Sequence, residues 1–182
     1  MNVKKLNETA KEMVANCKGI LAIDESHGTC KKRFESLNIP VNEENRRSYR
    51  DMLITAESLS NFISGAILFD ETIQQKTSDN ISFPEHMKKI GIIPGIKVDA
   101  GAKNFSCHPN EKITEGLDGL AERMLKYKEL GARFAKWRAV ITIDNSIPSD
   151  ACIIANAHAL ARYASICQEA DIVPIVEPEV LM

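Results

Sequence analysis

Ile172-Val-Pro-Ile-Val-Glu-Pro-Glu179 is a short apolar run that ends abruptly in charged residues. Four other stretches have the same design, at residues 19–24, 63–70, 91–99 and 132–138. Their starts lie roughly 30 to 45 residues apart, with helical patterns between them. Buried parallel strands that alternate with helices and carry polar residues at their carboxyl ends are typical of a (β/α)8 barrel.

The sequence therefore predicts an α/β fold of the TIM-barrel type, as a single domain over residues 1–182. Five such runs are present, whereas a closed barrel needs eight. We expect the barrel to be truncated after its fifth strand and incomplete at the C-terminus. Between the strands we expect a polar loop over residues 101–112 and helices over residues 4–17, 29–38, 42–56, 85–89, 114–130 and 149–170.

The composition is that of an ordinary globular protein, with 44% hydrophobic and 26% charged residues. A net charge of −2 offers no basic surface for nucleic acid. The polar N-terminus has no signal-peptide core, and no apolar run approaches the roughly 18 to 20 residues of a membrane span, so we expect a cytoplasmic protein with no membrane contact. The five cysteines are scattered and the four histidines show no metal-ligand spacing, which predicts reduced thiols and no metal site.

Side chains alternate along a strand, so two charged residues separated by one position project to the same side. If that side faces the barrel axis, the charged tips converge at one mouth: Asp24, Lys97, Lys136, Arg138, Glu177 and Glu179. Basic groups there can bind phosphate or an oxyanion, and carboxylates close to a lysine can exchange protons at neutral pH. The cluster predicts an enzyme site.

Other interpretations stay open at single positions. A solvated barrel rim explains one charged tip, such as Asp24 or Asp99, equally well. Two charged pairs on successive strands, Lys136 with Arg138 and Glu177 with Glu179, are harder to explain in that way, because burying unpaired ionisable groups is costly. The basic run that includes Arg33 is either a solvated helix face or a phosphate contact, and Trp137 is expected to pack between strand and helices.

Several motifs around these tips run in order through nearly the whole chain: Gly-Ile-Leu-Ala-Ile-Asp-Glu-Ser (19–26), Glu-Asn-Arg-Arg-Ser-Tyr-Arg (44–50), Gly-Ile-Lys-Val-Asp (95–99), Gly-Leu-Asp-Gly-Leu-Ala-Glu-Arg (116–123), Ala-Arg-Phe-Ala-Lys-Trp-Arg (132–138) and Ile-Val-Pro-Ile-Val-Glu-Pro-Glu (172–179). In these motifs the sequence resembles class I fructose-bisphosphate aldolase. The resemblance implies a lyase that cleaves fructose 1,6-bisphosphate to dihydroxyacetone phosphate and glyceraldehyde 3-phosphate in glycolysis and gluconeogenesis. It also implies that no metal or other cofactor is needed.

The resemblance implies a role for each matching residue. Asp24 matches the aspartate that orients substrate and handles protons near a Schiff base. Lys136 matches the lysine that assists carbinolamine formation and proton transfer, and Glu177 matches the acid that drives carbinolamine dehydration. Glu179 matches the glutamate that keeps the electrostatics of the Schiff-base lysine in order. Residues on the phosphate-binding side, the last two as weaker candidates, are Lys97, Arg138, Arg33 and Thr29.

One part of the family pattern has no counterpart in residues 1–182. In the family the lysine that forms the Schiff base lies on the sixth strand, and a second phosphate pocket comes from the seventh and eighth. The resemblance therefore does not by itself extend to activity of this chain alone. It implies a homo-oligomer, tetrameric or dimeric, for a full-length protein.

Two alternatives remain beside the leading interpretation. The chain can be a catalytically inactive aldolase fragment or interaction protein, whose open sheet edges pair with itself or with another chain. Alternatively, the family is right but the substrate is a different phosphorylated ketose.

Overall fold

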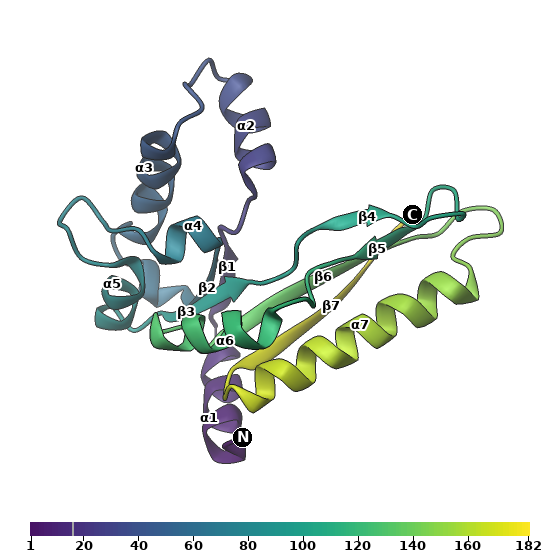
Figure 1. Cartoon of the computed structure of the whole chain (residues 1–182). Coiled ribbons are helices and arrows are strands. Elements are labelled where there is room, and N and C mark those ends of the chain that lie inside the picture. Colours follow the sequence, from purple (N-terminus) through teal and green to yellow (C-terminus); the bar gives the residue numbers. More distant parts are fainter. Residues whose placement is uncertain (16) are drawn as a thin grey trace.

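The computed structural model describes residues 1–15 and 17–182. Its main sheet has five parallel strands in the order β1 (Gly19–Ala22), β2 (Ile63–Leu68), β3 (Ile93–Lys97), β6 (Phe134–Thr142) and β7 (Val173–Leu181). Each strand overlaps one of the five predicted runs, and their order in the sheet is their order in the chain. The strands curve into half a barrel, which confirms the predicted architecture (Figure 1).

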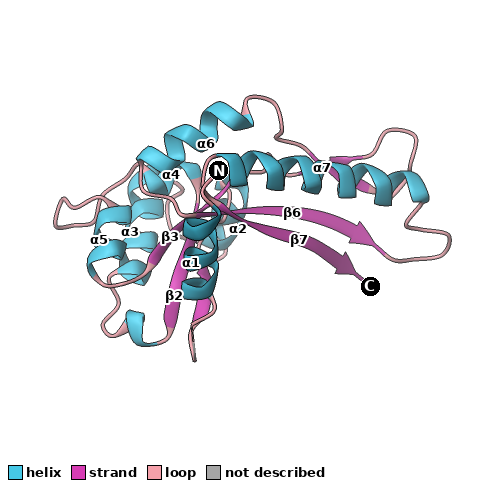
Figure 2. Ribbon diagram, turned by 90° about the horizontal axis from the view of Figure 1, so that it is seen from below, coloured by secondary structure: helices cyan, strands magenta, loops and turns pink. Residues whose placement is uncertain are grey.

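Seven α-helices accompany the strands in the described part of the chain; all but α1 lie between strands in the sequence. They are α1 (Val3–Met13), α2 (His27–Glu35), α3 (Glu43–Ile54), α4 (Asp70–Ile73), α5 (Phe83–Lys89), α6 (Leu120–Glu129) and α7 (Asp150–Glu169), with a short 3-10 turn at Leu59–Asn61. Helix α7 packs along β6 and β7 (Figure 2). Helix α1 lies under the amino ends of the strands, where Ser64 Oγ donates to Met13 O at 2.6 Å and Asn2 N donates to Asp171 Oδ1 at 2.5 Å.

Alternate side chains of each strand face two different apolar clusters. On β6, Ala135, Trp137 and Ala139 are buried between the sheet and the helices. As predicted, Trp137 packs against a helix, with its ring centroid 5.5 Å from that of Tyr163 on α7. This outer cluster contains most of the buried apolar side chains.

On β3, β6 and β7 the inward-facing residues change from apolar to charged toward the carboxyl end. Near the amino ends, Phe134 packs with Met13, Ile67 and Ile93 inside the half-barrel. Lys136 lies two residues beyond Phe134, on the same side of β6. The strands therefore build an apolar floor below a charged mouth, which is the arrangement of a TIM-barrel site.

Two glycines make room for the ring at the centre of this floor. A Cβ at Gly95 would lie 2.2 Å from a ring atom of Phe134, and one at Gly65 would lie 2.9 Å from another. Since non-bonded carbon atoms pack at about 3.5–4.0 Å, no side chain fits at either position without displacing the ring.

The predicted polar loop over residues 101–112 is wrong in part. It contains β4 (Ala102–Asn104), which pairs antiparallel with β5 (Lys112–Thr114). Strand β4 is three residues long and fully exposed, so it carries no alternating apolar pattern in the sequence.

The predicted helix start at residue 114 is also wrong, because α6 begins at Leu120. Thr114 ends β5, and its hydroxyl donates to Arg138 O at 2.7 Å. Gly116 and Gly119 then adopt φ values of 125° and 64°, which a right-handed helix does not admit. The predicted end is confirmed, since Gly131 (φ 103°) directly follows the last turn.

Smaller differences concern other boundaries. The helix predicted over residues 4–17 ends at Met13, and residue 16 lies outside the described part of the chain. Asp70 begins the short helix α4 instead of ending a strand, and β6 continues to Thr142. Among the described residues, no helix combines the length and the apolar character needed to cross a membrane.

Candidate functional site

A pocket of about 900 Å³ opens at the carboxyl ends of the strands. The eight residues predicted from the sequence all line it: Asp24, Thr29, Arg33, Lys97, Lys136, Arg138, Glu177 and Glu179. The structure therefore brings together every residue that strand alternation and the motifs single out. What each residue does there remains a prediction.

Lys136 lies in the pocket, at the second inward position of β6, after Phe134. Its side chain is 10% exposed, and its Nζ lies 3.2 Å from Asp24 Oδ2 and 3.5 Å from Glu177 Oε2. Register places this lysine opposite Lys97 on β3 and Ile175 on β7. An ammonium held between two carboxylates can pass a proton to either side, which suits general acid–base chemistry.

Lys97 is held in place by Asp99, two residues further along the same chain segment. The Lys97 Nζ lies 2.5 Å from Asp99 Oδ1, which also accepts a hydrogen bond from Gly101 N at 3.0 Å. The second carboxylate oxygen accepts from Arg138 N at 3.4 Å. Asp99, whose side chain is 2% exposed, thus connects the two basic residues predicted for the phosphate side.

Arg138 and Glu179 form an ion pair across β6 and β7 at the rim of the pocket. The hydrogen bond from Arg138 holds the pKa of Glu179 below its usual range, and the same bond raises the pKa of Arg138. Both side chains are more than one-third exposed. A bound anion can therefore reach the guanidinium from solvent.

Arg33 reaches the pocket from α2, but other residues already hold its guanidinium. It pairs with the Glu25 carboxylate and donates to Tyr49 Oη at 3.2 Å. The Glu25 charge raises the pKa of Arg33, while burial is the main cause of a raised pKa at Tyr49. Thr29 is also a weaker candidate, since its hydroxyl lies 3.3 Å from the hydroxyl of Ser26, the residue that caps α2 by accepting from Thr29 N at 3.4 Å.

Glu25, Asp99 and Lys103 line the pocket without having been predicted as site residues. Asp99 had a signal, because it follows Lys97 on the same side of the strand. Glu25 lies beyond the end of β1, where strand alternation no longer sets the direction of a side chain. Lys103 lies on β4, which the sequence does not predict.

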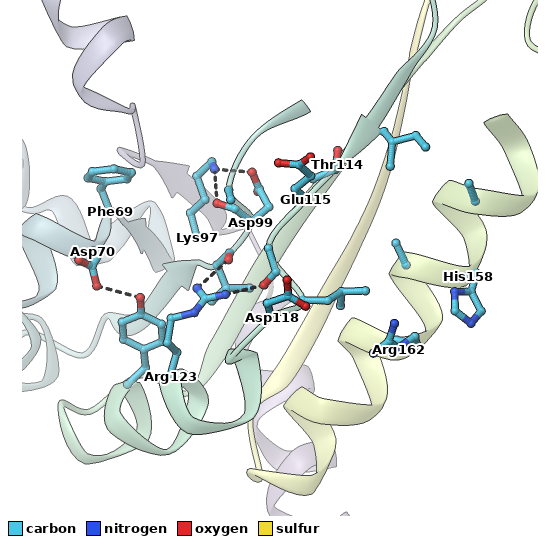
Figure 3. Close-up of a pocket in the computed structure, with 18 residues that line it drawn as sticks. Phe69, Asp70, Lys97, Asp99, Thr114, Glu115, Asp118, Arg123, His158 and Arg162 are labelled. Carbon is cyan, nitrogen blue, oxygen red and sulfur yellow. Dashed lines mark hydrogen bonds and ion pairs between the residues drawn. The ribbon is translucent and has the colours of Figure 1, made fainter. Parts of the chain in front are cut away.

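A second pocket, of about 990 Å³, lies on the other side of Asp99, between the hairpin, α6 and α7 (Figure 3). Two arginines line it: Arg162 lies on α7, and Arg123 stabilises the backbone by donating to Val98 O at 2.9 Å and to Gly116 O at 2.5 Å. Asp70 there accepts a hydrogen bond from Tyr127 Oη at 2.8 Å. Although this pocket is larger and shares Lys97 and Asp99 with the first, it lacks Asp24, Lys136 and Glu177, and we place the site in the first pocket.

Metal-ligating side chains do not gather in this part of the molecule. Over residues 1–15 and 17–182, no group of three or more histidine, cysteine, aspartate or glutamate residues could hold a metal ion.

Comparison with known proteins gives a consistent result along the chain. The profile of the family described as "Glycolytic: Fructose-bisphosphate aldolase class-I" matches residues 5–182. A probable fructose-bisphosphate aldolase class 1 of Xylella fastidiosa is 60% identical over 182 residues, which are 100% of this chain and 54% of that protein. Fructose-bisphosphate aldolase 1 of Toxoplasma gondii is 53% identical over 180 residues, or 98% of this chain and 50% of that protein.

A solved structure agrees with the sequence relatives. Fructose-bisphosphate aldolase from Plasmodium falciparum, crystallised in complex with TRAP and a small-molecule inhibitor, superposes with a TM-score of 0.94 at 52% identity. The match covers 98% of this chain and 52% of that one. The chain thus spans about half the length of the curated relatives it matches.

Proposed function

The chain belongs to the class I fructose-bisphosphate aldolase family, and on that premise we propose that its pocket is part of an aldolase active site. The substrate would be fructose 1,6-bisphosphate, cleaved to dihydroxyacetone phosphate and glyceraldehyde 3-phosphate. The single observation that supports this proposal most is the position of Lys136 between Asp24 and Glu177 at the mouth of the half-barrel.

In this proposal the central triad moves protons. Glu177, with a side chain 35% exposed, is open to a ligand in the pocket and can protonate a departing hydroxyl group. Asp24 and Lys136 are more deeply buried, and a proton can pass between them at 3.2 Å. Glu179 sets the local field through its pair with Arg138.

The phosphate end of the substrate would lie toward Lys97 and Arg138. Asp99 holds both residues at one side of the pocket, so a single phosphate could contact the two cations. Charge-assisted contacts of this kind are each worth about 1.5–3 kcal/mol. Arg33 could join them, because its contacts with Glu25 and Tyr49 both use Nη1 and its side chain is 54% exposed.

A Schiff-base lysine completes the chemistry in the proposed reaction. The three lysines lining the pocket are Lys97, Lys103 and Lys136, and two of them are held by carboxylates. Because the chain spans about half of its relatives, we propose that the nucleophilic lysine belongs to the part of the family fold that these residues do not include. The residues of this chain would then supply the proton transfers and one phosphate site.

Ligand binding tests this division of roles without requiring turnover. Calorimetric titration of the 182-residue chain with dihydroxyacetone phosphate should show binding. Arg138→Met should weaken it about 10- to 100-fold, because one charge-assisted contact is lost. Arg133→Met is the matched control: Arg133 pairs with Glu12 at 2.7 Å, beyond the opposite end of β6, and its loss should leave binding unchanged.

A borohydride reduction tests whether this chain forms a Schiff base in addition to binding the sugar phosphate. With dihydroxyacetone phosphate and borohydride, the proposal predicts no covalent adduct on this chain by mass spectrometry. Binding without an adduct supports it, whereas an adduct would show that the chain carries its own nucleophile. A folded chain that binds no sugar phosphate would overturn the proposal and favour the interaction-protein alternative.

We also propose that the protein works in the cytoplasm. One relative, from Arabidopsis thaliana, is named fructose-bisphosphate aldolase 4, cytosolic. The five cysteines of this chain are free thiols, as is usual in reducing compartments. Imaging of a tagged chain would test the location.

A further inference from the structure

Arg50, on the last turn but one of α3, is a guanidinium buried next to the candidate site. Its side chain is 2% exposed, although arginine is among the residues that proteins bury least often. It does not line the pocket and so contacts no substrate in the proposed reaction. Its burial therefore needs an explanation other than substrate binding.

The partners of Arg50 lie on either side of Asp24. Its Nε donates to Ile23 O at 3.3 Å, and its Nη2 donates to Glu25 O at 2.8 Å. The Glu25 carboxylate also lies 3.2 Å away, which balances the buried charge. One rigid side chain thus holds the main-chain carbonyls immediately before and after the candidate catalytic aspartate.

Arg50 makes these hydrogen bonds just beyond the point where the hydrogen bonds of the sheet end. Strand β1 ends at Ala22, and Ile23 N makes a last bond to β2, at Ile67 O (3.1 Å). Asp24 follows in a non-strand segment, yet its carboxylate must stay in contact with Lys136 Nζ. Arg50 provides the hydrogen bonds that fix this segment after the ladder has ended.

Neighbouring residues fix the position of Arg50 in turn. Its Nη1 donates to Cys30 Sγ at 2.9 Å, and its Cζ lies 5.1 Å from the centre of the Tyr49 ring. Cys30 is fully buried on α2. A planar guanidinium has several donors at fixed angles, which allows it to contact two carbonyls and a sulfur together. A lysine ammonium at the same place could not span them.

We propose that Arg50 is a positioning residue that sets the place of Asp24 relative to Lys136. The proposal rests on the proposed function insofar as Asp24 acts on a sugar phosphate. It goes beyond that function by assigning the precision of the site to a residue outside the pocket. Arg50 acts through the main chain at residues 23 and 25, not through contact with a ligand.

The test compares two lysine substitutions on one helix. Arg50→Lys keeps the charge but loses the double contact, so the Asp24–Lys136 separation, 3.2 Å here, should exceed 3.5 Å in a crystal structure of the variant. Arg46→Lys is the matched control, because Arg46 makes an equally bidentate contact on the same helix but with Glu71, at 2.6 and 2.8 Å. In that variant the separation should not change.

Comparing the affinities for two ligands distinguishes a displaced Asp24 from a general loss of stability. In Arg50→Lys, affinity for dihydroxyacetone phosphate should fall about tenfold, while affinity for inorganic phosphate, held at Lys97 and Arg138, stays within about twofold of the parent. Equal losses for both ligands would indicate general damage and overturn the proposal. So would an unchanged Asp24–Lys136 contact. If the parent chain binds no sugar phosphate, the proposed function fails, and the Asp24–Lys136 distance alone decides the positioning role.

A milder variant covers the case in which Arg50→Lys does not fold. Cys30→Ala keeps Arg50 and its charge but removes its sulfur acceptor. We expect a two- to fivefold selective loss of dihydroxyacetone phosphate affinity relative to inorganic phosphate. If Arg50→Lys unfolds and Cys30→Ala binds both ligands like the parent, Arg50 is a folding residue only and the proposal is wrong.

Discussion

Replacing Gly95 by alanine should destabilise the chain by forcing a methyl group into the ring of Phe134. The added Cβ would meet three ring atoms at 2.2, 2.3 and 2.6 Å. The ring cannot move toward β2, because it already packs closely against Gly65 there. A Cβ added at Gly65 would lie 2.9 Å from a ring atom. Overpacking of this kind typically costs about 1–3 kcal/mol, and we expect the upper end.

Urea unfolding can measure this cost with an internal probe. Trp137 is the only tryptophan in the sequence, and it is fully buried in the outer cluster. With a denaturant slope of about 2 kcal/mol per molar urea, a loss of about 3 kcal/mol lowers the midpoint by about 1.5 M. Gly19→Ala is the control, because nothing lies within 4 Å of its added Cβ; its stability should stay within about 1 kcal/mol of the parent.

A double variant tests the cause. Phe134→Leu alone should be destabilising, since it removes part of a fully buried ring. Combined with Gly95→Ala it should cost less than the sum of the two, with a coupling of at least about 1 kcal/mol. Additive effects, or a Gly95→Ala chain as stable as Gly19→Ala, would refute the argument that the two glycines exist to seat this ring.

Three further predictions concern ionisable groups and thiols. Glu71→Gln should lower stability at pH 7 by about 1–3 kcal/mol, because the hydrogen bond from Arg46 depresses the folded-state pKa of Glu71. The stabilisation by Glu71 is present above the unfolded-state pKa of about 4.3 and is lost as pH falls through the folded-state pKa. The gap in urea midpoints between variant and parent should therefore close in acid. Tyr127→Phe removes a phenol whose pKa burial and Asp70 raise to about 12, so alkaline absorbance titration should lose a phenolate step near that pH. A step near pH 10 that is present in the parent and lost in the variant would contradict the burial argument. A thiol reagent should modify the exposed Cys17 and Cys107 quickly, and the buried Cys30, Cys152 and Cys167 only after unfolding. Fast reaction of a third cysteine would contradict the burial of the last three.

The sheet and the pocket could be predicted because one pattern encodes both. In a parallel barrel strand the inward positions are apolar near the amino end and polar near the carboxyl end, and alternation fixes which residues they are. Lys136 and Arg138 follow from that rule alone, as do Glu177 and Glu179. The structure places them together without any adjustment of register.

The rest depended on contacts between segments that no local pattern contains. Strand β4 is exposed and is ordered by pairing with β5. Thr114 looks like a helix start until Gly116 and Gly119 take left-handed conformations. Arg50 looks like a solvated helix residue, and only the carbonyl groups beyond β1 explain its burial.

The position of α1 has a consequence for the order in which the chain can fold. This helix precedes the strands in the sequence, yet it contacts β7 as well as β2, and Asn2 bonds to Asp171 across 169 positions of sequence. Contacts of such high sequence separation require closing a very long loop, which raises contact order and slows folding. During synthesis α1 can dock on β2, through Met13 and Ser64, long before its contacts with β7 and Asp171 can form, because those need nearly the whole of these 182 residues. Pulse-labelling hydrogen exchange should find the amides of β7 and of Asn2 protected last, after those of β1 and β2.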